Sequence, residues 1–341
     1  MAVTPSERED AVRFLRDIED EPVALQRVLD TYFGDSSPLR AVRESKATSG
    51  ARVILTGMGS SYYAALVGAW WLQRHGVAAW ASYASELDEF RCGGRWALVA
   101  VSQSGATAET VRAVEAFRRS CDGPVIAVVN REGSPMAGMG DIVLPLEAGA
   151  EGRVPGKSWV ASVAVVTLVA GAMAGNDHVL DQPGMEAAIE AQRRILATWD
   201  GIGSYLAEAL TGARVLHVLG SGPGLASAYE CATVIKETAR LPAEPMLAAD
   251  FLHGSYLLVQ PGYAAVLFSG SLTGWRDRDV RERIIQRGGR VIDIGEQAPH
   301  PIREPLATLP PGARPLVEAC PIERFAVSAW LARLDAEAHE P

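Results

Sequence analysis

Cysteine is scarce in this chain and is never clustered. Four cysteines occur among 341 residues, and no two of them form a Cys-x-x-Cys pair: Cys92, Cys121, Cys231 and Cys320. Zinc sites usually need such pairs, often together with clustered histidines, and the sequence has neither. We therefore expect no metal site, and nothing indicates a cofactor. The four thiols are predicted to be buried and reduced, as in a cytosolic protein.

Positive charge is also in deficit. Lysine and arginine total 32 against 41 aspartate and glutamate residues, which gives a formal net charge of −9. Proteins that bind nucleic acid through its phosphate backbone need a basic surface. The deficit argues against that class, and we expect no nucleic-acid partner.

No apolar run is long enough to cross a membrane. The nearest candidate is ASVAVVTLVAGAMAG at 161–175, which is shorter than the roughly 20 residues of a membrane span. The first ten residues, MAVTPSERED, are charged where a secretory signal peptide would be apolar. We interpret 161–175 as a buried core helix and expect a cytoplasmic protein with no membrane partner.

What the sequence does contain is a strand, turn and helix pattern that occurs twice. ARVILTGMGSSYYAALVGAWWLQRHG at 51–76 has an apolar run, a glycine-serine turn and a helical stretch, and ARVLHVLGSGPGLASAYECATVIKETA at 213–239 repeats this order. Further apolar runs alternate with helical stretches in each half. Such alternation is typical of parallel sheets covered by helices on both faces, with ligands at the carboxyl ends of the strands.

The repeat predicts an α/β fold with two tandem domains, each a doubly wound, flavodoxin-like parallel sheet flanked by helices. A chain of this length with 48% apolar residues is sufficient for two hydrophobic cores. The predicted boundaries are a helical lead-in over 1–45, a first domain over 46–180, a helical linker over 181–210 and a second domain over 211–341.

One loop has an unusual number of hydroxyl groups. In VAVSQSGATAETVRAVEAF at 99–117, the hydroxyls of Ser102, Ser104 and Thr107 accompany the amide of Gln103. At the N-terminus of the following helix these groups suit a phosphate dianion. The loop has neither a lysine nor a P-loop motif, so a sugar monophosphate is favoured over a nucleotide. The alternative is structural: Thr107 caps the helix and the serines complete a turn.

Three motifs in order along the chain resemble those of the tandem sugar isomerase (SIS) domain family. They are GMGSSYYAA at 57–65, SQSGATAET at 102–110, and YECATVIKE followed by AADFLHG between 229 and 254. The family includes the isomerase half of glucosamine-6-phosphate synthase, amino-sugar-phosphate deaminases and fructosamine-phosphate deglycases. The resemblance extends from about Ile18 to about Leu334 and implies two SIS domains that act on a phosphorylated sugar.

The resemblance also implies site residues. The phosphate-binding set falls on Ser61, Ser102, Gln103, Ser104 and Thr107. Glu237 falls on the carboxylate that moves a proton between sugar carbons 1 and 2, and His253 on the histidine that assists ring opening. In the family that histidine reaches the site of a neighbouring subunit, which implies a homodimer with a shared active site. AGAEGRVPGKSW at 148–159 resembles the segment that wraps the sugar, and adds Val154 and Lys157.

Elementary chemistry is consistent with the roles of Glu237 and His253. Moving a proton between adjacent carbons needs one base that takes the proton and returns it, and a partly buried carboxylate with a raised pKa can do both near neutral pH. Histidine titrates in the range that ring opening needs. The alternative for each is structural, because a glutamate near a helix end is most often a solvated surface residue and a lone histidine is most often a cap or a core group.

The sequence departs from the family pattern at several positions. Val234 stands where synthases have a lysine, Ser255 follows the His-Gly pair, and Pro155 interrupts the wrapping segment. The C-terminal residues DAEAHEP offer no lysine to lie over the sugar. Residue 2 is Ala2 where a glutamine-hydrolysing domain would have a nucleophilic cysteine, so we expect no glutaminase activity.

The sequence therefore predicts a homodimeric enzyme that moves a proton between carbons 1 and 2 of a phosphorylated sugar or amino sugar. The outcome is isomerisation, or amine loss as in a deaminase or deglycase. A competing interpretation is a catalytically silent phosphosugar-binding protein that senses a metabolite or regulates a partner. A third is an enzyme that keeps the phosphate site and has changed its chemistry.

Overall fold

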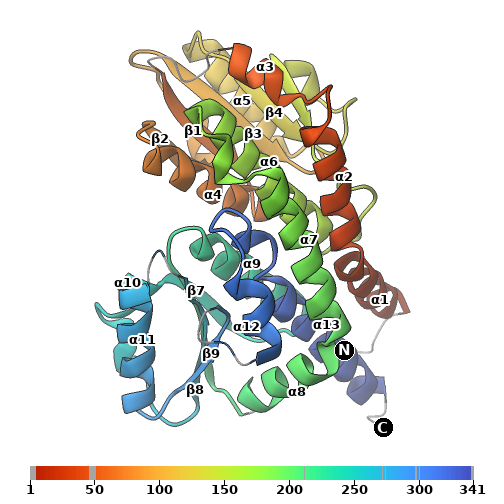
Figure 1. Ribbon diagram of the computed structural model, residues 1–341, viewed down its shortest axis with the longest axis vertical. Coiled ribbons are helices and arrows are strands. Elements are labelled where there is room, and N and C mark those ends of the chain that lie inside the picture. The colour runs from red at the N-terminus through yellow and green to blue at the C-terminus, as the bar shows by residue number, and fades with distance from the viewer. Residues whose placement is uncertain are drawn as a thin grey trace. The chain divides into compact units, whose positions relative to one another are not determined.

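The computed structural model describes residues 5–45, 51–210, 212–270, 272, 274–295, 298 and 300–338. The chain forms two compact units. The first-sheet unit consists of Val23–Ala150 and Lys157–Glu186, and the second-sheet unit of Met1–Pro22, Glu151–Gly156 and Ala187–Pro341. Each unit contains one parallel sheet (Figure 1). The α/β class with two helix-flanked parallel sheets is confirmed, whereas the exact domain boundaries stay a prediction.

The first-sheet unit is built on five parallel strands in the order β2-β1-β3-β4-β5. The strands are β1 Arg52–Gly57, β2 Ala79–Tyr83, β3 Trp96–Ser102, β4 Val125–Val129 and β5 Ile142–Pro145. The central strands β1, β3 and β4 are buried along almost their whole length, because a parallel sheet has helices on both faces. The chain reverses its direction of winding at β1, which pairs with both β2 and β3.

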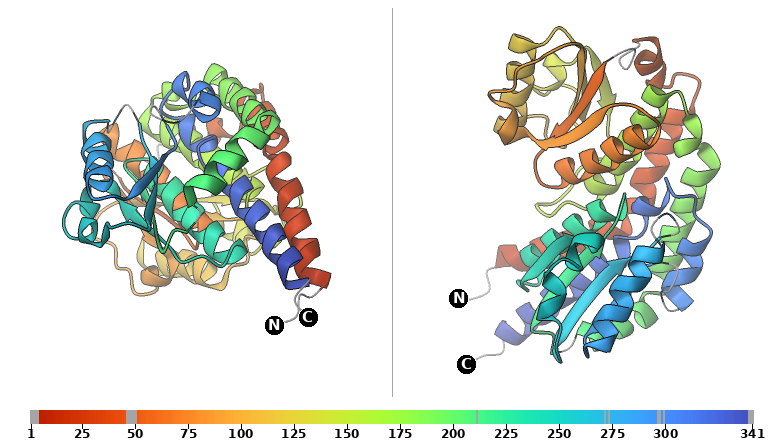
Figure 2. Two further views of the ribbon diagram at one scale, coloured as in Figure 1. Left: turned by 90° about the horizontal axis from the view of Figure 1, so that it is seen from below. Right: turned by 90° about the vertical axis from the view of Figure 1, so that its left-hand side faces the viewer.

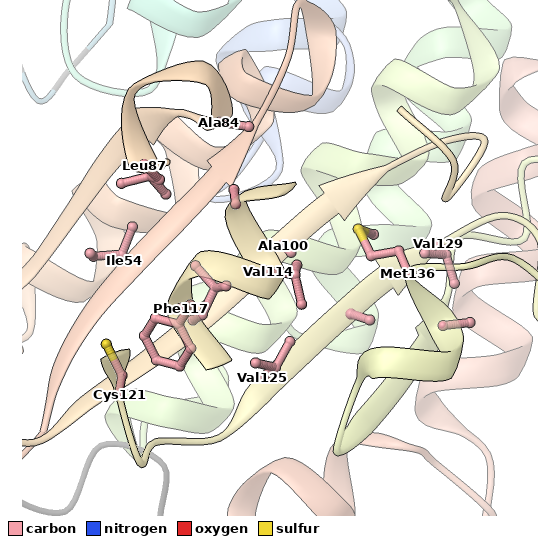
Figure 3. Packing of buried hydrophobic residues seen from close by; sticks show 14 residues of the cluster. Ile54, Ala84, Leu87, Ala100, Val114, Phe117, Cys121, Val125, Val129 and Met136 are labelled. Carbon is pink, nitrogen blue, oxygen red and sulfur yellow. The ribbon is translucent and has the colours of Figure 1, made fainter. Parts of the chain in front are cut away.

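Helices α3 Leu39–Glu44, α4 Ser60–Arg74, α5 Ala108–Ser120 and α6 Lys157–Ala174 surround this sheet, and α2 Glu21–Phe33 enters the unit. Figure 3 shows α5 placing Val114 and Phe117 against Ile54, Ala100 and Val125 of the strands. On α6, every residue from Lys157 to Met173 is buried. This helix is long and apolar enough to span a membrane, but 94% of it is buried inside the structure. It is the core helix that the sequence predicts.

The second-sheet unit repeats this plan with four parallel strands in the order β7-β6-β8-β9. The strands are β6 Val215–Gly220, β7 Ala243–Leu247, β8 Tyr263–Phe268 and β9 Arg290–Asp293. The order matches β2-β1-β3-β4 position for position. The duplication seen in the sequence is therefore a duplication of sheet topology.

The helices of this unit lie on both faces of its sheet (Figure 2). Val280 and Ile284 of α11 pack with Phe251 of α10 over one face, where Leu219 and Leu267 of the strands meet them. The helices are α1 Pro5–Glu19, α8 Trp199–Leu210, α9 Gly224–Thr238, α10 Ala248–Phe251, α11 Gly274–Gln286, α12 His300–Ala307 and α13 Cys320–Ala338. Helix α7, Gln182–Ala197, leads into the unit.

The cysteine prediction is half wrong. Cys231 and Cys320 are free and buried, as expected, but Cys92 and Cys121 are joined in a disulfide. The pair is 29 residues apart in sequence, and the fold brings it together because α5 runs back along β3, so that its C-terminal end lies beside the chain that precedes the strand. The hydroxyl of Ser120 donates to the Phe90 carbonyl at 3.0 Å in the same place. The disulfide removes the cysteine argument for a reducing compartment.

Buried carboxyl groups are concentrated in the second-sheet unit. Glu21 in the first turn of α2 and Glu323 on α13 are both fully buried, and burial together with the nearby Glu21 raises the pKa of Glu323. The amide of Gln192 on α7 donates to Glu21 at 2.8 Å and to the Leu316 carbonyl at 2.7 Å. Burial raises the pKa of Glu21 to about 8, so this carboxyl binds a proton near neutral pH.

Candidate functional site

The turn between β1 and α4 positions Ser61. A side chain at Gly57 would put its Cβ 2.7 Å from the carbonyl carbon and the Cβ of Ser61, so only glycine lets the first turn of α4 approach the strand this closely. Gly59, with φ of 52°, precedes the helix in the left-handed region that glycine tolerates. Ser61 is consequently held, half-buried, at the helix N-terminus beyond the carboxyl end of a central strand.

The loop between β3 and α5 brings together the hydroxyls that the sequence singles out. The Oγ of Ser102 lies 3.2 Å and the Oγ of Ser104 lies 3.5 Å from the Oγ1 of Thr107. Ser102 is buried, while Ser104 and Thr107 are half-buried. Three hydroxyls therefore meet at the start of α5, where the helix dipole favours an anion.

The structural alternative for this loop is only partly observed. Thr107 occupies the N-cap position of α5, but its side chain makes no capping hydrogen bond. The serines do support the turn, since the amide of Gly105 donates to Ser102 at 3.1 Å and the amide of Ala106 donates to Ser104 at 3.2 Å. Each hydroxyl oxygen that accepts from an amide keeps its own hydrogen, which can rotate from the neighbouring hydroxyl to a ligand.

Backbone contacts hold this loop in place. The Gly105 carbonyl accepts from the Met136 amide at 2.9 Å, and the Gln103 carbonyl accepts from the Asn130 amide at 3.3 Å. A Cβ on Gly105 would come within 2.5 Å of the Ser134 side chain, so a larger residue would displace the loop. The site is therefore built on the ends of β3 and β4 rather than on a free loop, which favours preorganised binding.

Glu237 lies in the last turn of α9, in the second-sheet unit. More than a third of the residue is exposed, yet desolvation by the surrounding protein raises the pKa of its carboxyl, against the opposing charges of Arg153 and Lys236. A raised pKa is what a carboxylate needs in order to accept and return a proton near neutral pH. No sequence motif singles out Arg153, which belongs to the segment that the family resemblance assigns to sugar wrapping.

His253 follows the short helix α10 in the same unit and is exposed. Its amide donates to the Asp250 carbonyl at 2.9 Å, which closes the turn before Gly254. Leu257 and Leu258, in the 3-10 turn Ser255–Leu258 that comes next, are 64% and 50% exposed. The predicted histidine is therefore exposed to solvent, next to the exposed side chains of Leu257 and Leu258.

The middle of the wrapping segment and its two ends fall in different units. In Glu151–Gly156, the Glu151 carboxylate accepts from the Gly156 amide at 2.9 Å, the Asp17 carboxylate accepts from the Gly152 amide at 2.8 Å, and Val154 is buried. In the first-sheet unit, Lys157 is buried and its Nζ donates to the Ala150 carbonyl at 2.9 Å. Val154 and Lys157 thus have structural contacts within their own units.

Each unit thus contains part of the predicted set. The first-sheet unit holds the phosphate loop, where the hydroxyls converge, together with Ser61, Gln103 and Lys157. The second-sheet unit holds Val154, Glu237 and His253. Val234, at the position of the synthase lysine, is fully buried in α9, so the hydrophobic core occupies that place.

Comparison with known proteins supports the resemblance. Residues 48–174 match the model of the SIS domain. The glutamine–fructose-6-phosphate aminotransferase of Aeropyrum pernix is 31% identical over 268 residues, which cover 75% of this chain and 43% of the relative. That of Streptomyces coelicolor is 28% identical over an alignment of 358 positions, which covers 94% of this chain and 56% of the relative. The chain spans about half the length of these relatives.

Solved structures share the fold over nearly the whole chain. The C-terminal domain of glucosamine-fructose-6-phosphate aminotransferase from Francisella tularensis has a TM-score of 0.79 at 19% identity and covers 94% of this chain and 95% of its own. Glucosamine-6-phosphate deaminase from Thermotoga maritima has a TM-score of 0.76 at 18% identity, with the same coverages. Tagatose-6-phosphate ketose/aldose isomerase from Escherichia coli has a TM-score of 0.75 at 20% identity and covers 93% and 92%. The chain is a SIS-domain protein, related in sequence to the glutamine–fructose-6-phosphate aminotransferases and alike in fold to phosphosugar isomerases and deaminases.

Proposed function

We propose that this protein is an enzyme that binds a phosphorylated sugar or amino sugar and moves a proton between carbons 1 and 2. The observation that carries the proposal is the convergence of Ser102, Ser104 and Thr107 at the N-terminus of α5, without a side-chain cap. Hydroxyl donors and a helix N-terminus together form an anion site. The match of residues 48–174 to the SIS domain supports a sugar phosphate as this anion.

In the proposed reaction, Glu237 is the base. Its carboxylate takes the proton from carbon 2 of the opened aldose, and the electron pair of that C–H bond forms the carbon 1–carbon 2 double bond of an enediolate, with the negative charge on the oxygen of carbon 1. Transfer of the hydroxyl proton on carbon 2 to this oxygen, and return of the first proton from Glu237 to carbon 1, give the ketose. One group with a raised pKa performs both steps, and such a positioned base contributes about 10²–10⁴ in rate. If carbon 2 bears an amino group, the same transfer yields an imine that water can hydrolyse, which releases the amine.

His253 is proposed to assist ring opening from a neighbouring copy of the chain. The supporting observation is its exposure beside Leu257 and Leu258, because large exposed apolar side chains in one place mark an interaction surface. A homodimer would cover them. Mixing inactive Glu237→Gln protein with inactive His253→Asn protein should then restore part of the activity through hybrid sites. Fully exchanged heterodimers that stay inactive would refute the shared site.

The phosphate loop is tested by binding. Ser104→Ala with Thr107→Ala removes two hydroxyl donors, and charge-assisted hydrogen bonds contribute about 1.5–3 kcal/mol each, so the affinity for glucosamine 6-phosphate or fructose 6-phosphate should fall at least tenfold in calorimetry. Ser85→Ala, which removes an exposed hydroxyl of the same unit, is the matched control. Unchanged affinity in the double variant would remove the loop from the site.

The second candidate is a silent phosphosugar-binding protein. The buried Val234 at the synthase lysine position favours it, since Schiff-base chemistry is absent there. Both candidates bind phosphosugars, and turnover separates them. An assay of every bound sugar phosphate for isomerisation and amine release assigns the enzyme if any product forms and the binding protein if none does.

A further inference from the structure

A cleft lies in the second-sheet unit, beyond the carboxyl ends of β6 and β8. It encloses about 370 Å³ of empty space, including its mouth, and Ser221, Gly224, Ser269, Gly270, Arg314 and Glu318 line it. Because β6 pairs with β7 on one side and β8 on the other, the winding of the sheet reverses here. Ligands of open parallel sheets bind at such reversal points.

The turn at this cleft copies the geometry of the β1–α4 turn. Gly220 holds the place of Gly57, since a Cβ on either would lie less than 3 Å from the helix backbone four residues on. Gly222, with φ of 57°, holds the place of Gly59. The side chains differ: Gly224 replaces Ser61, and Ser221 stands where the first turn has a methionine. The hydroxyl of Ser221 therefore lies three residues earlier in its turn, nearer the strand, than the hydroxyl of Ser61 does in the β1–α4 turn.

Ser221 provides the observation that points to a ligand. The residue is only 5% exposed, and its hydroxyl has no hydrogen-bond partner among the described residues. A buried hydroxyl without a partner is unfavourable and uncommon in native proteins. An acceptor atom bound in the cleft would satisfy it.

A buried cation lies on the other wall. Arg314 is 7% exposed, and its guanidinium donates to the Ser269 carbonyl at 2.5 Å, which fixes it at the cleft. A Cβ on Gly270 would lie 3.4 Å from this guanidinium, so the absence of a side chain there leaves room for a ligand atom. An arginine held in this way can present paired N–H donors to an oxyanion.

A buried acid, Glu318, also lines the cleft. Burial raises the pKa of Glu318, against the attraction of Arg314 and a 2.7 Å hydrogen bond donated by Ser227, so its neutral form is favoured relative to an exposed glutamate. The N-terminus of α9, a helix of 15 residues, adds positive potential to the same cleft.

We propose that this cleft is a second oxyanion site, which takes the phosphate group of a small phosphate ester on Ser221, Arg314 and the N-terminus of α9. It is separate from the phosphate loop at 102–107, which belongs to the other unit. The site does not depend on catalysis by Glu237, and it gives the protein a place to bind a second phosphorylated metabolite.

The experiment counts inorganic phosphate bound to the full chain, by isothermal titration calorimetry and phosphorus NMR. Wild type should bind two phosphates per chain, and the Ser104→Ala, Thr107→Ala variant should keep one. In that background, Ser221→Ala should weaken the remaining site about tenfold and Arg314→Gln should abolish it. Thr238→Val, which removes another buried hydroxyl of α9, is the control and should change nothing.

Two results would overturn the inference: no phosphate bound once the loop is changed, or a remaining site indifferent to Ser221→Ala. If circular dichroism shows that Arg314→Gln does not fold, phosphate binding by Ser221→Ala still tests the inference. The failure of the proposed function looks different, because the loop variant would then bind as many phosphates as the wild type.

Discussion

Glu21→Gln is expected to stabilise the protein, and more strongly as the pH rises. Glu21 is fully buried against Glu323 in the second-sheet unit, and burial raises its pKa from 4.5 to about 8. Glutamine keeps the shape of the side chain and can accept the 2.8 Å hydrogen bond from Gln192, but it cannot ionise. The substitution therefore removes only the cost of a buried charge.

The sign and size of this stability difference follow from the difference in proton binding between the folded and unfolded states. Between pH 4.5 and 8 the folded state holds a proton on Glu21 that the unfolded chain releases, so rising pH destabilises the wild type across this window. Below pH 4.5 both states are protonated and the cost is absent. At 1.36 kcal/mol per pKa unit, the shift corresponds to on the order of 5 kcal/mol at pH 8 and above. Because Glu21 and Glu323 titrate as a pair, this figure belongs to both carboxyls.

Urea denaturation of both proteins from pH 4 to pH 9 measures the effect. The difference in free energy of unfolding should be near zero at pH 4 and should grow steadily to pH 8. Glu9→Gln, a change of an exposed glutamate, is the control and should give a small difference at every pH. A Glu21→Gln protein that is less stable than wild type at pH 8 would refute the account of this pair.

Two further predictions concern the first-sheet unit. Gly57→Ala should destabilise the protein by roughly 1–3 kcal/mol in thermal unfolding, because the new Cβ would meet the backbone of Ser61, whereas Gly133→Ala, with nothing within 4 Å, should have little effect; equal effects would show that the turn can relax. Reduction with dithiothreitol should open the Cys92–Cys121 loop of 29 residues and lower the free energy of unfolding by roughly 2–4 kcal/mol, and a Cys92→Ser, Cys121→Ser protein should be insensitive to the reductant; an unchanged wild type would show that the disulfide is absent in solution.

The sequence predicts the central strands and two edge strands, and misses the other two edge strands. Apolar runs identify β1, β3, β4, β6 and β8, because strands inside a parallel sheet are buried on both faces. The apolar runs at 141–146 and 290–295 identify the edge strands β5 and β9. The edge strands β2 and β7 have no such run: Trp80 is 47% exposed, and Pro245 interrupts β7. Strands with one neighbour tolerate exposed residues and proline, so periodicity does not reveal them.

Part of the candidate site can likewise be predicted from the sequence, and part cannot. The hydroxyls of the phosphate loop lie within six residues of one another, so the sequence alone places them together. Arg153 beside Glu237, and Arg314 in the cleft with Ser221, come from segments more than 80 residues away from their neighbours. Such pairings depend on how the helices and loops return to the sheet, which no local pattern encodes. The Cys92–Cys121 disulfide is another pairing of this kind, because its two residues are 29 positions apart in the sequence.

The most direct test of the central claim is the chemistry of Glu237. Wild-type protein and Glu237→Gln are given the sugar phosphate that binds best, in D₂O, and both turnover and deuterium at carbons 1 and 2 are followed by NMR. Glu237→Gln should bind normally and turn over roughly 10²–10⁴ times more slowly, with deuterium entering the product of the wild type at carbon 1 or 2. Glu208→Gln, a change of an exposed glutamate in the same unit, should behave as wild type. Undiminished turnover by Glu237→Gln would contradict the account.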